Sequence, residues 1–132
     1  MPAKLIIAAG VLGASGVLLG ALGAHALKDV LDADSRKGEA FATAVDYHLI
    51  HALAVLTLGF FAGRGAGKTS RRSISAAWAM VSGVAIFSGS LYIWSLGGPS
   101  WLVHVTPFGG LTLIVGWLLV AWVGLGLTTD RE

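Results

Sequence analysis

Residues Leu5–Ala24 read LIIAAGVLGASGVLLGALGA, a stretch with no charged side chain. An α-helix rises about 1.5 Å per residue, so roughly 20 apolar residues cross about 30 Å of hydrocarbon. Three runs of similar length follow it, at Ala44–Ala62, Ile74–Leu96 and Phe108–Leu127. Together the four runs take up most of the 132 residues and leave no room for a separate soluble unit. They predict one all-α integral membrane domain over residues 1–132, an antiparallel four-helix transmembrane bundle.

The composition agrees with this class and excludes several others. The chain is 55% hydrophobic and 12% charged, against about 25% charged in ordinary soluble domains. It has no cysteine, which removes disulfides and thiolate chemistry. Its basic residues are too few to form a nucleic-acid patch. Residues 62–69 read AGRGAGKT and match a relaxed phosphate-loop pattern, but they follow a membrane helix instead of a strand, so no nucleotide partner is expected.

The distribution of basic residues predicts an orientation. If all four runs span, the two tails and the loop Gly63–Ser73 share one side, and the positive-inside rule makes the more basic side cytoplasmic. The opposite side carries three basic residues diluted by carboxylates, at Lys28, Arg36 and Lys37. Six basic residues fall on the side of the termini: Lys4, Arg64, Lys68, Arg71, Arg72 and Arg131. The sequence therefore predicts that both termini are cytoplasmic.

A stripe of small residues runs along the first helix. At 100° per residue, Gly13, Gly16, Gly20 and Gly23 lie on one face, and Gly16 and Gly20 form a GxxxG motif. Small residues let membrane helices approach closely. The stripe is interpreted as packing against the protein's own helices, with homo-oligomerisation as the alternative.

The histidines are the candidates for chemistry. His25 ends the first run, His48 and His51 are expected in the opening turns of the second, and His104 precedes the fourth, with Asp46 at the same depth. All lie opposite the basic loop. An ionisable residue inside a span is a functional-site hypothesis, and imidazole is the commonest metal ligand. The candidate metal ligands are therefore His25, His48 and His51, and capping of helix ends or contact with lipid phosphate is the structural alternative.

Four short motifs resemble one known family. They read GALGAHAL at 20–27, TAVDYHLIHAL at 43–53, FSGSLY at 87–92 and TPFGG at 106–110, followed by Gly116 and Trp117. In this order they resemble domain of unknown function 423, a YgdD-like family of small bacterial inner-membrane proteins that is also similar to the eukaryotic transmembrane protein 256. His48 departs from the pattern, in which Gln more often follows the Tyr.

The resemblance implies a compact four-helix inner-membrane protein and brings no established activity. It points to a set of positions that lie mostly toward the outer side: His25, Tyr47, His51, Ser88, Ser90, Tyr92, Thr106 and Pro107. We expect these to form a polar cluster on the non-cytoplasmic side. The expected function is non-enzymatic, with the cluster binding a lipid, a small ligand or a larger membrane complex and no cofactor required.

Two alternatives stay open at this point. The first is a small redox subunit with haem or a transition metal ligated by His25 and His51. The second is a cation transport or channel oligomer, with Asp46 and the histidines along the ion path.

Overall fold

A computed structural model describes residues 2–129 of the chain. Within these residues the structure is helical, with no strand, and its elements are α1 (Pro2–Ala24), α2 (Lys28–Asp32), α3 (Ser35–Arg64), α4 (Gly67–Ser95) and α5 (Leu102–Thr129). The four long helices are each long and apolar enough to cross a membrane. The four-helix membrane architecture predicted from the apolar runs is confirmed.

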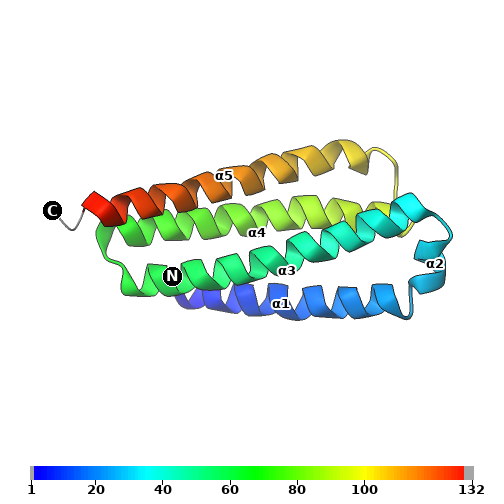
Figure 1. Ribbon diagram of the computed structural model, residues 1–132, viewed down its shortest axis with the longest axis horizontal. Helices are drawn as coiled ribbons and strands as arrows, with labels where there is room; N and C mark the ends of the chain where they lie inside the picture. Colours follow the sequence, from blue (N-terminus) through cyan, green and yellow to red (C-terminus); the bar gives the residue numbers. More distant parts are fainter. Residues whose placement is uncertain (1, 130–132) are drawn as a thin grey trace.

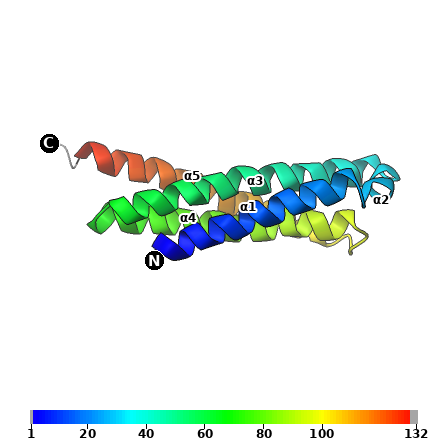
Figure 2. The same ribbon diagram turned by 90° about the horizontal axis from the view of Figure 1, so that it is seen from below.

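The four long helices run antiparallel, and each packs on the next along the chain. α1 packs on α3, α3 on α4, and α4 on α5, so α1 and α5 lie on the two flanks of the central pair (Figure 1). α1 begins and α5 ends at one end of the bundle, and the short helix α2 lies at the other (Figure 2). The flanking helices are the more apolar and have the smaller share of buried residues, as expected for helices that face lipid.

The helices extend beyond the apolar runs at their N-terminal ends. α3 begins at Ser35 because the Asp34 side chain caps it, accepting a hydrogen bond from the backbone N–H of Arg36 at 3.1 Å. Helical hydrogen bonds continue through the polar interface, where hydropathy no longer marks the helix. The expectation that His48 and His51 lie in opening turns therefore does not hold, since both lie near the middle of α3.

The expected loop over residues 63–73 is much shorter than the sequence suggested. α3 and α4 are joined by Gly65 and Ala66 alone. The N–H of Gly65 donates to the carbonyl of Phe61 at 2.8 Å, and the Ser70 hydroxyl donates to the carbonyl of Ala62 at 2.8 Å. The phosphate-loop-like residues thus belong to the end of one helix and the start of the next.

α4 ends in a Schellman motif. Gly98 N–H donates to the Ile93 carbonyl at 2.8 Å and Gly97 N–H to the Trp94 carbonyl at 3.1 Å. Gly97 has a φ of 98°, a left-handed conformation that L-residues with a side chain rarely adopt. The turn returns the chain toward α5, which packs along α4.

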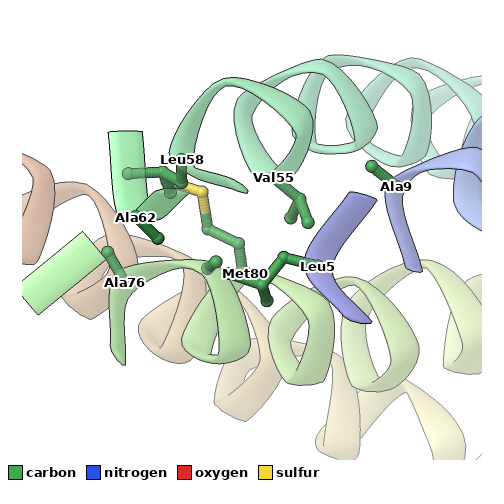
Figure 3. Packing of buried hydrophobic residues seen from close by; sticks show 8 residues of the cluster. Leu5, Ala9, Val55, Leu58, Ala62, Ala76 and Met80 are labelled. Atoms are coloured by element: carbon green, nitrogen blue, oxygen red, sulfur yellow. The ribbon is translucent and has the colours of Figure 1, made fainter. Parts of the chain in front are cut away.

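The larger apolar cluster occupies the half of the bundle that holds the chain termini, and a second one, of Leu31, Phe41, Ala44 and Tyr92, lies toward the α2 end. Figure 3 shows Leu5 of α1, Val55 of α3 and Met80 of α4 packed together, each fully buried. Ala9, Leu58, Ala62 and Ala76 surround them. Polar side chains are buried mainly in the other half and at mid-length.

Candidate functional site

His48 links three helices through its two ring nitrogens. Nδ1 lies 3.1 Å from the hydroxyl oxygen of Tyr92 in α4, and Nε2 lies 3.2 Å from the hydroxyl oxygen of Ser15 in α1. The Ser15 hydroxyl also reaches the carbonyl of Val11 at 2.8 Å. His48 is buried, and so is Tyr92. One imidazole thereby ties α1, α3 and α4 together.

Hydrogen-bond accounting assigns the tautomer of His48. If Ser15 donates its single proton to the Val11 carbonyl, its oxygen accepts from Nε2–H, and the Tyr92 hydroxyl donates to Nδ1. Every proton in this chain then has an acceptor. The other tautomer would leave the Tyr92 proton without a partner inside the bundle, which is costly. We assign the Nε2–H form.

His51 makes the corresponding link between α3 and α5. Its Nδ1 lies 2.6 Å from the Tyr47 carbonyl oxygen, one turn back along α3, and must donate to it. Its Nε2 accepts from the indole N–H of Trp117 in α5 at 3.1 Å. The two ring centroids are 5.9 Å apart in an edge-on arrangement. Both nitrogens of this buried imidazole are therefore in use.

Three hydroxyl groups complete the interhelical contacts. The Ser88 hydroxyl of α4 donates to the Ala44 carbonyl of α3 at 2.8 Å. The hydroxyls of Ser90 in α4 and Thr106 in α5 share a hydrogen bond of 2.8 Å. Within residues 2–129, no buried side-chain nitrogen or oxygen lacks a partner. We call this set the polar network, comprising Ser15, His48, His51, Ser88, Ser90, Tyr92, Thr106 and Trp117.

The polar network lies deep in the bundle. A Cβ atom added at Gly16 of α1 would come 3.4 Å from Cδ2 of His48, which places the two residues at one level. Gly16 is eight residues, about 12 Å, from the Ala24 end of a helix about 34 Å long. His48 thus lies about 12 Å from the α2 end of α1, deeper in the bundle than the opening turn of α3.

Several residues singled out in the sequence lie outside this network. His25, in the turn after α1, and His104, in the first turn of α5, are exposed and make no side-chain hydrogen bond within the described residues. Asp46 is exposed on α3. Tyr47 is 42% exposed and contributes its carbonyl to His51 while its ring packs on Phe87 at 4.6 Å.

Other network members gave no clear signal in the sequence. Ser15 sits inside the most apolar run, where a lone hydroxyl normally bonds its own helix backbone. Trp117 suggested packing, and no pattern in one sequence pairs it with a histidine 66 residues away. His48 carried a weaker prediction than His51 because its residue type departs from the family pattern.

The histidines do not fit a metal or haem site. His48 and His51 each use both ring nitrogens inside the protein, so neither has a free lone pair for a metal in this arrangement. His25 lies at the end of α1, away from both. Residues 2–129 contain no group of three or more His, Asp or Glu side chains placed to hold an ion. The structure does not support ligation by His25 and His51.

The glycine stripe of α1 faces α3 over part of its length. An added Cβ would come 2.7 Å from Cδ2 of Leu49 at Gly16, 3.3 Å from Cγ1 of Val45 at Gly20, and 2.6 Å from Cε1 of Phe41 at Gly23. At Gly13 it would meet nothing within 4 Å. Three of the four glycines thus allow close approach of α3, and the fourth borders open space.

Two apolar clefts open on the lateral surface. The cleft between α3 and α5 has a volume of about 290 Å³ and is bounded by Thr57, Phe61, Trp117, Val120 and Gly124, among others. A second cleft of about 540 Å³ separates α1 from α3 and is bounded by Gly10, Gly13 and Leu53, among others. Both open between helices that are long and apolar enough to cross a membrane.

The chain is a polytopic helical membrane protein. Its apolar helices form an antiparallel bundle, and an internal, hydrogen-bonded polar network holds them together. The chain belongs to the family described as Protein of unknown function (DUF423), which matches residues 19–110. The matched segment includes α3, α4 and the start of α5, and therefore most of the polar network.

Relatives cover most of the chain. It is 37% identical to the UPF0382 membrane protein YwdK of Bacillus subtilis over 83% of this chain and 89% of that protein. It is 34% identical to the UPF0382 inner membrane protein YgdD of Escherichia coli, over 88% and 85% of the two chains, respectively. A UPF0382 membrane protein of Haemophilus influenzae is 35% identical over 80% and 81%. No solved structure matches this chain.

Proposed function

We propose that this protein is a non-enzymatic lipid-binding component of the cell inner membrane that holds an acyl chain in the cleft between α3 and α5. One observation carries the proposal. Two polar side chains border the cleft, and the donor of each is already hydrogen-bonded inside the protein. Thr57 donates to the Leu53 carbonyl at 2.9 Å, and Trp117 donates to His51 at 3.1 Å. The rest of the lining is apolar, so the cleft offers an occupant apolar contact alone.

The polar network supports this function by fixing the shape of the cleft. The His51–Trp117 hydrogen bond joins the two helices that form its walls, and α4 lies beneath them. A large aromatic side chain held in one position gives a wall of defined shape, which lowers the entropy lost on binding. Every N–H and O–H donor of the network has an acceptor inside the protein, so its role is positional.

The same geometry disfavours the two alternatives of the sequence analysis. A redox subunit needs histidine nitrogens that are free to bind metal. A cation path needs polar groups that reach both ends of the bundle. Here the half that holds the termini is filled by the apolar cluster around Leu5, Val55 and Met80. We further propose that the termini face the cytoplasm, because the basic residues gather at their end of the bundle.

A cleft-filling variant tests the proposal. Gly124 borders the cleft, and a Cβ there would meet nothing within 4 Å, so Gly124→Leu fills the cleft without a clash at its first carbon. Gly10→Leu is the matched control, since Gly10 borders the α1–α3 cleft and also has open space. The measurement is native mass spectrometry of protein purified in mild detergent, counting retained phospholipid.

The wild type and Gly10→Leu are expected to retain a phospholipid that Gly124→Leu loses. Retention by all three proteins would overturn the proposal, and so would a wild type that retains none. If Gly10→Leu alone lost the lipid, the α1–α3 cleft would be the binding site and the assignment to α3 and α5 would be refuted. Thermal unfolding of the three proteins checks that each is folded.

A further inference from the structure

We propose that the groove between the first turns of α4 and the last turns of α5 binds the phosphate group of an anionic phospholipid. The groove has a volume of about 360 Å³ and is lined by Lys68, Arg71, Arg72 and Ser75 of α4 and Trp122 of α5. We call it the basic groove. Three cations in one concavity match the charge and hydrogen-bonding needs of a phosphate, while the Ser75 hydroxyl donates to the Arg71 carbonyl at 3.1 Å.

Arg72 is held in position by α5. Its guanidinium carbon lies 4.2 Å from the centre of the Trp122 ring, and Nη1 donates to the Trp122 carbonyl at 3.3 Å. Gly126 makes this possible, because a Cβ there would come 2.5 Å from Nη1. A guanidinium has five N–H donors, so most remain for a ligand. The side chain that would contact phosphate is therefore ordered before binding, which lowers the entropy cost.

The other cations share a flank of α4 with Arg72 and have no counter-charge among the described residues. Residues at spacings of three, four and seven lie on one face of a helix, which groups Lys68, Arg71 and Ser75. Within residues 2–129 every Asp and Glu falls between Asp29 and Asp46, toward the α2 end. No described residue forms an ion pair with these cations. An anion would supply the charge that the described part of the chain does not.

The position of the basic groove selects a lipid over a free anion. Trp122 lies two turns from the end of α5, the level at which tryptophan marks a membrane interface. Leu118, one turn deeper on α5, is 65% exposed, and Trp78, two turns deeper than Arg71 on α4, is 40% exposed. These apolar side chains lie where acyl chains continue from the phosphate. Basic pockets between membrane helices are suited to anionic headgroups.

This inference does not rest on the proposed function, because the two sites lie on different sides of α5. At 100° per residue, Trp122 is about 140° from Trp117 and about 160° from Gly124, both of which border the acyl-chain cleft. A lipid in the cleft is selected by its apolar chain. A lipid in the basic groove is selected by its charge.

The test compares phosphatidylglycerol with phosphatidylcholine of identical acyl chains, titrated onto delipidated full-length protein in neutral detergent. Binding is followed by native mass spectrometry. The variant is Lys68→Gln/Arg71→Gln, chosen because both side chains are exposed and have no described partner. The control is Arg64→Gln, which removes a charge at the same end, where the guanidinium lies 5.8 Å from the Phe60 ring on α3.

We expect the wild type and Arg64→Gln to bind phosphatidylglycerol at least tenfold more tightly than phosphatidylcholine, since each basic residue near the surface adds roughly a fivefold preference. The double variant should lose most of that preference. Equal binding of the two lipids by the wild type would overturn the inference, as would an equal loss in Arg64→Gln. Displacement of phosphatidylglycerol by an equal concentration of inorganic phosphate would identify a free-anion site and refute the lipid assignment.

The outcomes also separate the two proposals. Gly124→Leu should keep the preference for phosphatidylglycerol, because it leaves the basic groove intact. Conversely, Lys68→Gln/Arg71→Gln should keep the lipid held in the α3–α5 cleft. Loss of headgroup preference in Gly124→Leu would mean that the basic groove is not an independent site, which would overturn the inference as stated.

Discussion

Gly109 of α5 lies against the backbone of α4, and replacing it with alanine tests how closely these helices must pack. A Cβ there would come 2.7 Å from Cα and 2.8 Å from Cβ of Phe87, and still closer to its backbone nitrogen. Backbone atoms cannot move aside by a rotamer change. The helices would have to separate by roughly 1 Å or more to reach ordinary contact distances.

The separation has two costs. Overpacking of this kind typically costs about 1–3 kcal/mol. The hydrogen bond between Ser90 and Thr106, one turn away on the same interface, would stretch from 2.8 Å to the limit of a useful bond. Interhelical hydrogen bonds in membranes average about 0.6 kcal/mol. Relative to an alanine substitution in open space, we expect Gly109→Ala to lower the free energy of unfolding by about 2–3 kcal/mol.

Gly124→Ala is the matched control, because it lies in the same helix and its added Cβ would meet nothing within 4 Å. Both variants make the same change in helix propensity, so their difference isolates the packing term. The assay is equilibrium unfolding in mixed micelles with increasing SDS, followed by circular dichroism. If the free energies of unfolding of the two variants differed by less than about 0.5 kcal/mol, the close approach of α4 and α5 would not contribute to stability as argued.

Two further predictions concern the polar network and the orientation. His48→Phe should lower the free energy of unfolding by about 2 kcal/mol, since it removes two interhelical bonds and leaves the Tyr92 hydroxyl unpaired. Adding Tyr92→Phe should restore part of this loss in the same unfolding assay. If His48→Phe left the free energy of unfolding unchanged, the stabilising role of the network would be refuted. Because the chain has no cysteine, single cysteines at Lys68 and Ser35 report sidedness cleanly. A membrane-impermeant maleimide added to whole cells should label Ser35→Cys and spare Lys68→Cys, and the reverse pattern would place the termini outside.

The number and order of the membrane helices were predictable because hydropathy reports burial in hydrocarbon directly. The helix ends were not, since caps and turns outside the hydrocarbon set them. α3 begins at an Asp34 cap, nine residues before its apolar run. α5 begins at Leu102 and continues through Pro107, which ordinarily signals a break. Pro107 has no N–H for the Val103 carbonyl four residues back, and membrane helices tolerate such a loss when neighbouring groups satisfy the freed carbonyl.

The residue types of the polar network were predictable in part, but their partners were not. Tyr92, Ser88, Ser90 and Thr106 stood in family-like motifs, and the structure places all four at helix–helix contacts. The pairing of His51 with Trp117 depends on the relative rotation of α3 and α5, which no local pattern encodes. His48 and His51 lie near the middle of α3 because the helix begins nine residues before its apolar run.

The hydrogen bonding of the polar network bears on both proposed sites. A buried polar group in a membrane is stable when it is fully hydrogen-bonded, and the bonds of His48 and His51 are all made within the chain. The network therefore fixes helix positions and leaves no donor for outside ligands. A cleft lined in part by Asp32 and Asp46 lies at the α2 end. The two sites proposed above are the apolar cleft on the lipid-facing surface and the basic groove beside Trp122. Both lie in the lipid phase or at its boundary, and this favours lipid as the class of ligand over a soluble metabolite.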